Sequence, residues 1–430
     1  MSSSLNEGAL ITYGIDEIVK VFEGVHTLTD MTQAYDPGAA SLQRSANQYW
    51  KPIQQQAVVK EGWDLTGQQD GVLELSIQGS LGDPTNTYRQ LRADDVRDET
   101  AYRRAVRADA MRLLGDMEAK GLSTAATYGS FCVTDSAAFG SADFDLWDGL
   151  STCTTRMEDT EFNIDDGVCA FLNPDAYRAG GKNLITSNAR FSQNLPDDAY
   201  KQNLLQNRVA GFDDVYSHPK LQRVTAQATS LTVNGDQSFA PQATELANNG
   251  SPVPFDNRYA TIPTNEATTG INVGDKFYIA NVFAVSLDEK IQLDYEQTFT
   301  VTSVGTNEIT VSPRPIALDD AALSDLEKAY ANINTTISNG DTIVWLNTAA
   351  RRSNVVMAKD AMVLASSPIP LNHELFPNLF AEQFQVGPIN GIIAFNGNID
   401  DFTGSYRIGL WYDWNIEKPE QIGVLLDAQA

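Results

Sequence analysis

The stretch that decides the fold is QLRADDVRDETAYRRAVRADAMRLLGDMEAKG, residues 90–121. Acidic residues are concentrated at its start, where the helix dipole favours negative charge. Gly121 can adopt the left-handed conformation that commonly ends a helix, so we predict that the helix ends there. From Asp95 to Lys120 such a helix would be about 39 Å long at about 1.5 Å per residue. Apolar side chains recur along it at spacings of three and four, which places them on one buried face. These residues are Tyr102, Val106, Ala110, Leu113 and Met117.

The opposite face carries Arg103, Arg104 and Arg107, with Arg112 beside them, in a chain whose formal net charge is −26. One interpretation is a solvated face with local ion pairs such as Glu99 to Arg103. The other is a basic ridge that meets acidic surface elsewhere in the molecule or on a neighbouring copy. Composition does not choose between them, so the first three arginines are candidate inter-subunit residues.

The length and composition are those of a folded protein with two or three domains. The chain has 430 residues, of which 42% are hydrophobic and 20% are charged. Its 56 acids against 30 bases argue against dense phosphate contacts with nucleic acid and suit basic partners. The three cysteines are too few and too widely spaced for a disulfide framework, and we expect them to be buried thiols. We expect neither a signal peptide nor a membrane span.

Two segments near the start are candidates for contacts with other molecules. Residues 5–24 predict an amphipathic helix followed by a Pro/Gly hinge, which either packs locally or docks on a partner. Residues 49–53 and 72–77 read as strands that flank a long polar hairpin. Trp63 lies in that hairpin, where it either folds back or anchors in another subunit.

A change of composition marks residues 221–348, which are dense in Thr, Asn, Gly and Val. Short strands with regular turns predict a small β-barrel or sandwich. Within it, Asn234-Gly235 after the short strand 229–233 is a strong hairpin signal. The flanking sequence is of mixed α and β type, so we interpret the segment as an insertion whose two ends emerge close together.

Catalytic and metal-binding patterns are weak. The three histidines share no ligand spacing, and no Gly-x-Ser-x-Gly elbow occurs. Acid pairs such as Asp213/Asp214 and Asp319/Asp320 leave a carboxylate-dependent hydrolase open as one alternative. A tail or adhesin protein that binds through the β-rich domain is another. We expect no catalytic residues, no metal and no cofactor.

Several sequence segments closely resemble the coat protein of the short-tailed Salmonella-type bacteriophages. They run in order from near Leu5 to near Val424. The segments are EGWDLT (61–66), QLRADDVRDETAYRR (90–104), RVAGFDDV (208–215), NRYAT (257–261), PIALDD (315–320), AYAN (329–332) and PIPLNHELF (368–376).

The resemblance implies an α+β chain with the Hong-Kong-type bacteriophage capsid fold and an inserted all-β barrel domain. That fold has a long spine helix, peripheral and axial domains, an extended loop and an N-terminal arm. The implied parts are an N-terminal arm (1–36), an extended-loop hairpin region (37–82), the spine helix and peripheral domain (83–130), the first part of the axial domain (131–220), the inserted barrel (221–348) and the return strands of the axial and peripheral domains (349–430).

The implied function is structural, with no enzyme activity: a subunit of an icosahedral virus capsid. Copies would form pentamers and hexamers with scaffolding protein, as a procapsid that rearranges on packaging double-stranded DNA. The implied partners are the chain itself, scaffolding protein, portal protein and DNA held without sequence-specific binding, with no membrane. The implied location is the virion, after assembly in the bacterial host cytoplasm.

In this family the N-terminal arm meets a basic scaffolding protein, which makes Asp16 and Glu17 candidate scaffold contacts. Lys20 stands where another acid would be expected. The loop at 247–252 matches a family loop that carries acids and a Lys for contacts across a twofold axis, yet Ala247, Asn249 and Pro252 are uncharged here. We therefore expect hydrogen bonds, or no contact, at that loop.

Overall fold

The computed structural model describes most of the chain, and its described residues fall into two compact units. The described residues are 7–24, 28–37, 47–53, 56, 58, 60, 63, 71, 73–92, 99–138, 145–160, 167–180, 209–246, 250–369, 380–398 and 403–429. The first unit takes in Met1–Tyr49, Gly79–Gly121 and Val363–Asn415, and the second takes in Trp50–Gln78, Leu122–Met362 and Ile416–Ala430.

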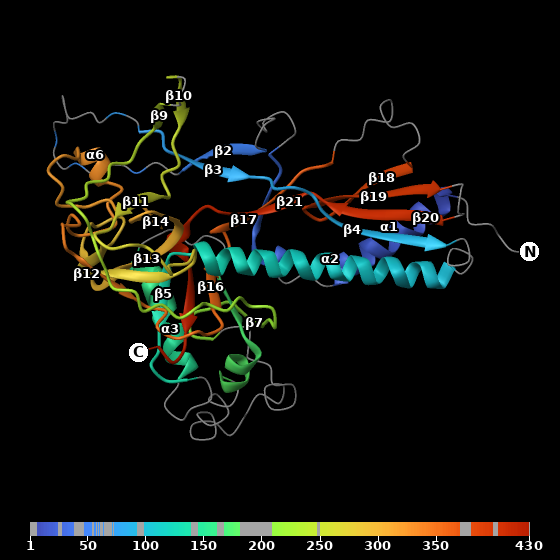
Figure 1. Cartoon of the computed structure of the whole chain (residues 1–430), viewed down its shortest axis with the longest axis horizontal. Helices are drawn as coiled ribbons and strands as arrows, with labels where there is room; N and C mark the ends of the chain where they lie inside the picture. The colour runs from blue at the N-terminus through green and yellow to red at the C-terminus, as the bar shows by residue number, and fades with distance from the viewer. Residues whose placement is uncertain are drawn as a thin grey trace, which may run out of the picture. The chain divides into compact units, whose positions relative to one another are not determined.

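The first unit is built on an antiparallel four-stranded sheet with the order β18-β19-β20-β4 (Figure 1). Its strands are β4 (Thr85–Arg92), β18 (Phe380–Val386), β19 (Ile389–Asn398) and β20 (Thr403–Leu410). Helix α1 (Glu7–Gly24) packs against β18 and β19. A three-stranded sheet, β1-β17-β21, follows η1 (Thr29–Met31). Its strands are β1 (Gln33–Tyr35), β17 (Met362–Ser366) and β21 (Tyr412–Ile416).

Helix α2 (Glu99–Tyr128) is the predicted spine helix, and its 30 residues span about 45 Å (Figure 1). The predicted stop at Gly121 is wrong, because the helix continues for seven residues beyond it. Gly121 is needed for packing: a Cβ there would lie 2.4 Å from Leu28 Cδ2 and 2.7 Å from Trp414 Cε2. The acidic segment 93–98 that was expected to begin the helix lies outside the described residues.

The second unit contains a mixed five-stranded sheet with the order β5-β22-β16-β6-β7. Its strands are β5 (Phe131–Thr134), β6 (Val168–Leu172), β7 (Asp214–Ser217), β16 (Asn354–Ala358) and β22 (Ile422–Leu426). Every residue of β6, β16 and β22 is buried, as expected of central strands covered on both faces. Helix α3 (Leu146–Asp159) packs on β5 and β22, and Asp145 caps its beginning. Residues 174–180 are also helical, and η2 (Pro419–Gln421) precedes β22.

The predicted β-rich segment forms a six-stranded sheet with the order β11-β14-β13-β12-β15-β8. Its strands are β8 (Leu231–Thr232), β11 (Ala260–Pro263), β12 (Lys276–Val285), β13 (Gln292–Gly305), β14 (Glu308–Ser312) and β15 (Thr342–Trp345). An isolated bridge from Val233 to Thr264 links the two edge strands, and one apolar cluster fills the interior. Smaller elements are the pair β9 (Thr244–Leu246) and β10 (Pro252–Pro254), and helix α6 (Asp325–Lys328).

Two local strand predictions need correction. Asn234-Gly235 does not join paired strands, because the preceding strand β8 pairs with β15, more than a hundred residues later in the chain. The strand expected at 72–77 is shifted along the chain: β3 covers Ser76–Ser80 and pairs with β2 (Gln48–Pro52). The uncharged loop positions at 247–249 lie outside the described residues.

Candidate assembly surfaces

The predicted buried stripe of the spine helix is confirmed. Tyr102, Val106, Ala110, Leu113 and Met117 are each at most 2% exposed. The Tyr102 hydroxyl donates to the Leu10 carbonyl of α1 at 3.1 Å, and burial raises the pKa of this phenol. Its ring meets Tyr406 of β20 edge-on, with centroids 6.0 Å apart. One side chain therefore contacts the N-terminal helix and the sheet of the first unit.

An ionic network centred on the buried Asp109 of the same helix was not predicted. Asp109 accepts from Arg89 of β4 through two nitrogens, at 2.9 and 2.5 Å, and from the Tyr406 hydroxyl. Two strands and the spine helix are thus fixed to one carboxylate. No local sequence signal could have found this network, because Asp109 and Tyr406 are 297 positions apart.

The three candidate arginines of the spine helix have different environments. Arg103 pairs with Glu99 at 2.8 Å and with Glu17 of α1 at 3.2 Å, and its guanidinium lies 4.4 Å from the centroid of the Tyr13 ring. The structure thereby bears out the local Glu99 pair. It also brings together Arg103, a candidate inter-subunit residue, and Glu17, a candidate scaffold contact.

Arg104 and Arg107 lie on the exposed side of α2. Arg104 donates only to the Thr100 carbonyl, at 3.2 Å, and Arg107 contacts no acid in the described part of the chain. Arg112 and the half-exposed Met111 continue this strip. We call Arg104, Arg107, Met111 and Arg112 the basic strip; it is the part of the predicted ridge that internal contacts leave available.

Two other predicted contact residues are solvent-facing. Asp16 is exposed on α1, beside the buried Glu17. Trp63 is fully exposed, so it does not fold back on the described part of its own chain. Tryptophan side chains are usually at least partly buried. A fully exposed indole is therefore available to be buried at an interface with another subunit.

The six-stranded sheet is joined to the end of the spine helix by a buried lysine. Lys276, the first residue of β12, is 0% exposed, and its ammonium donates to the Gly129 carbonyl, to Thr300 Oγ1 at 2.7 Å and to the Thr127 carbonyl at 3.4 Å. The two carbonyl acceptors lie at the C-terminal end of α2, where the helix dipole favours a cation, and Thr300 lies on β13. Burial lowers the pKa of Lys276 to about 7.

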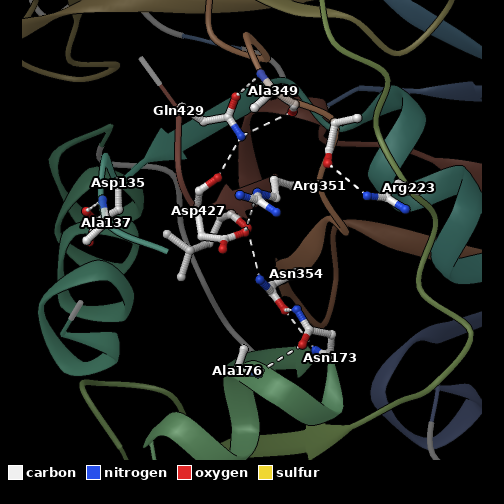
Figure 2. Close-up of polar contacts among 12 residues, drawn as sticks. Asp135, Ala137, Asn173, Ala176, Arg223, Ala349, Arg351, Asn354, Asp427 and Gln429 are labelled. Carbon is white, nitrogen blue, oxygen red and sulfur yellow. Dashed lines mark hydrogen bonds and ion pairs between the residues drawn. The ribbon is translucent and has the colours of Figure 1, made fainter. Parts of the chain in front are cut away.

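The two ends of the β-rich segment lie together, as the sequence predicted. Val224 N–H donates to the Arg351 carbonyl at 2.8 Å, and Ser353 N–H donates to the Gln222 carbonyl at 2.9 Å. Arg223 adds a side-chain bond to the Ala350 carbonyl at 3.2 Å (Figure 2). The exact limits 221–348 remain a prediction.

Residues near the C-terminal end of the chain bind the segment that leaves the β-rich region (Figure 2). The Gln429 amide accepts from Ala349 N–H at 2.8 Å and donates to the Ala349 carbonyl at 3.3 Å. Asp427 lies 3.9 Å from Arg351, and Asn354 donates to the Leu425 carbonyl at 3.1 Å. The last residues of the chain therefore hold the outgoing end of the β-rich segment against the five-stranded sheet.

The described residues include three buried thiols but no cluster of metal-ligating side chains. Cys132, Cys153 and Cys169 are buried free thiols, as predicted, and burial raises the pKa of each. No group of three or more metal-ligating side chains occurs among the described residues. Nor does any helix in the described ranges have the length and apolarity to span a membrane.

Comparison with known proteins confirms the resemblance seen in the sequence. The I-domain of the CUS-3 coat protein is 31% identical over 28% of this chain and 99% of its own, with a TM-score of 0.23. The capsid of cyanophage P-SCSP1u is 11% identical over 94% and 89% of the two chains, with a TM-score of 0.45. Mycobacterium phage Che8 is 11% identical over 93% and 91%, also at 0.45. The family model described as P22 coat protein, gene protein 5, matches residues 3–427, so the chain belongs to the P22 coat protein family and is a structural capsid subunit, not an enzyme.

Proposed function

We propose that many copies of this chain form pentamers and hexamers of an icosahedral procapsid, together with a scaffolding protein. The shell then rearranges as double-stranded DNA enters, through a portal protein, without sequence-specific binding of the DNA. Assembly takes place in the bacterial cytoplasm and the mature location is the virion. A net charge of −26 suits a container that does not hold its packaged DNA tightly.

The observation that carries this proposal is the fully exposed Trp63, in the segment that the family resemblance assigns to an extended loop. An inter-subunit anchor must be free in the isolated chain and buried in the shell. The basic strip has the same property for charge, because three arginines face solvent on a chain that is otherwise acidic. A neighbouring copy supplies the acidic surface, so closed symmetric assembly can satisfy both features.

The test is assembly of Trp63→Ala with scaffolding protein, followed by sedimentation and electron microscopy. We expect normal folding, because the exposed side chain makes no contact with the described residues that could be lost, and a clear loss of shells. Trp147→Ala is the matched control: this half-exposed indole lies on α3, outside the extended loop. Equal shell yields from both variants would remove Trp63 as an anchor.

A charge exchange separates the internal and external roles of Arg103. Arg103→Glu should leave the fold intact and harm assembly. The double variant Arg103→Glu with Glu17→Arg restores an ion pair between the two helices. If the double variant regains normal assembly, Arg103 acts only within its own chain; if it stays defective, Arg103 or Glu17 contacts another molecule.

A further inference from the structure

The second unit contains a cavity of about 420 Å³ that none of the proposed assembly roles uses. This volume is within the usual range of pockets that bind small molecules. Charged and amide side chains alternate with aliphatic ones in its lining, whose exposed surface is more apolar than polar. The walls come from the β2–β3 pair, the β-rich segment and the loop before β22. The aliphatic residues of the wall include Leu75, Ile77, Val285, Leu287 and Ile316.

Arg314 gives this cavity an uncompensated positive charge. It is only 8% exposed and no carboxylate of the described residues contacts it, and burial lowers its pKa. Its Nε donates to the Ala240 carbonyl at 3.1 Å and its Nη1 donates to the Tyr259 carbonyl at 3.0 Å. A guanidinium has five N–H donors, so these two bonds leave three without a described acceptor.

Two aromatic rings lie close to this guanidinium. Its carbon lies 4.9 Å from the centroid of Phe255 and 5.5 Å from that of Phe239. The remaining N–H groups, one on Nη1 and two on Nη2, lie side by side in the plane of the guanidinium. This is the fork geometry that matches a carboxylate.

The cavity's own acids are in no position to neutralise Arg314. Glu417 is held by Lys51 at 2.6 Å, so this carboxylate already has a cation. Asp288 is exposed. Glu420 has no ion-pair partner in the described chain, and burial raises its pKa to about 7, which makes its neutral form a potential hydrogen-bond donor.

We propose that this cavity binds a small amphiphile with one carboxylate group, of the fatty-acid class. The carboxylate lies on the free edge of Arg314, and the hydrocarbon chain lies against the aliphatic walls. Such a ligand would touch the base of the extended loop, the β-rich segment and the loop before β22 at once. Binding to the folded state alone would therefore stabilise the contact among these three segments.

Calorimetric titration of the purified full-length chain with decanoate tests the proposal, with decanol as the uncharged probe of equal length. We expect one decanoate per chain and binding of decanol that is about 10-fold weaker or more, because hydrogen bonds to charged groups are the strongest. Arg314→Lys should weaken decanoate binding and reduce its advantage over decanol, since it keeps the charge and loses the fork. Arg223→Lys, outside the cavity, is the matched control and should bind as the parent chain does.

A second variant, Leu287→Trp, tests the cavity even if substitution of Arg314 prevents the β-rich segment from folding. Leu287 is partly buried on the cavity wall, and an indole there should narrow the space for the hydrocarbon chain and weaken decanoate binding. Equal affinity for decanoate and decanol would overturn the carboxylate subsite. Unchanged binding to Leu287→Trp would show adventitious binding elsewhere and overturn the cavity assignment. Neither result bears on shell assembly, so the proposed function is judged separately.

Discussion

Replacing Lys276 by Met tests how the β-rich segment is fixed to the spine helix. Methionine has a similar length and no charge, so it fills the same space while removing the ammonium. The Gly129 carbonyl keeps a partner in the variant, because Thr300 Oγ1 also donates to it at 2.7 Å. Asp275, the neighbouring acid, is bound to Gln227 and Asn347 and does not contact the ammonium. The substitution thus removes one buried charge without creating a new one.

The magnitude follows from the difference between folded and unfolded pKa values. The pKa of Lys276 is about 7 when folded and 10.5 when unfolded, so between these values the unfolded chain binds one more proton. The free energy of unfolding of the parent chain therefore rises with pH across this window, by up to about 1.4 kcal/mol per pH unit. Between pH 7 and 8.5 the Lys276 contribution amounts to about 1.5–2 kcal/mol. Below pH 7 the penalty for the buried charge is fully present.

Urea denaturation of the unassembled chain at pH 7, 7.5, 8 and 8.5 measures this difference. Lys276→Met should lose the upward slope, and its stability should exceed that of the parent chain most clearly at pH 7. Taking the difference between parent and variant cancels the titration of the buried cysteines, whose contribution has the opposite sign. Lys220→Met, at an exposed lysine, is the control and should follow the parent chain. A parent and variant with parallel pH profiles would refute the reasoning, because the carbonyl acceptors would then fully compensate the charge.

Three further substitutions test the first unit by urea denaturation and soluble yield. Asp109→Ala should lower the free energy of unfolding by about 1–3 kcal/mol, because it leaves the buried Tyr406 hydroxyl without its carboxylate acceptor, while the exposed Asp116→Ala should change it by less than about 0.5 kcal/mol; similar values for the two would mean that the network contributes nothing. Gly121→Ala should cost about 1–3 kcal/mol through overpacking, outweighing a helix-propensity gain of about 1 kcal/mol, whereas Gly404→Ala, with nothing within 4 Å of its Cβ, should be tolerated. A Gly121 variant more stable than the parent would contradict the packing argument. Tyr102→Asp should abolish soluble folding, since burying an unpaired charge costs several kcal/mol, and a normal yield of soluble, folded protein would rule this out.

Local periodicity predicted the elements that local physics controls. The stripe from Tyr102 to Met117 is buried as the spacing of three and four required. The start of the helix that follows Asn173 is fixed locally as well, because Asn173 Oδ1 accepts from two N–H groups of the first helical turn. In these places the chain needs no distant partner to decide its conformation.

The wrong predictions concern positions whose conformation depends on residues remote in the sequence. Gly121 has the signature of a helix stop, but its lack of a side chain serves the close approach of Leu28 and Trp414, which the sequence around it does not reveal. Asn234-Gly235 has the signature of a hairpin, but β8 finds its partner in β15. The cavity around Arg314 was missed for the same reason, because three remote segments build its walls. Turn and cap signals report what a backbone can do, and tertiary packing selects among those possibilities.

The pairing of Arg103 with Glu17 sets a condition on the proposed scaffold contact. Glu17 is largely buried and already accepts from Arg103 at 3.2 Å and from Lys20 at 3.3 Å. A basic scaffolding protein that used Glu17 would have to displace Arg103, whereas the exposed Asp16 on the next position is available at no such cost. Ion pairs of this partly exposed kind contribute about 1 kcal/mol or less, so the competition would weaken the contact about fivefold at most. Asp16 should therefore carry the larger share of a scaffold contact. Displacement of Arg103 would also loosen α1 from the spine helix, so scaffold binding at Glu17 and docking of the N-terminal helix would oppose each other.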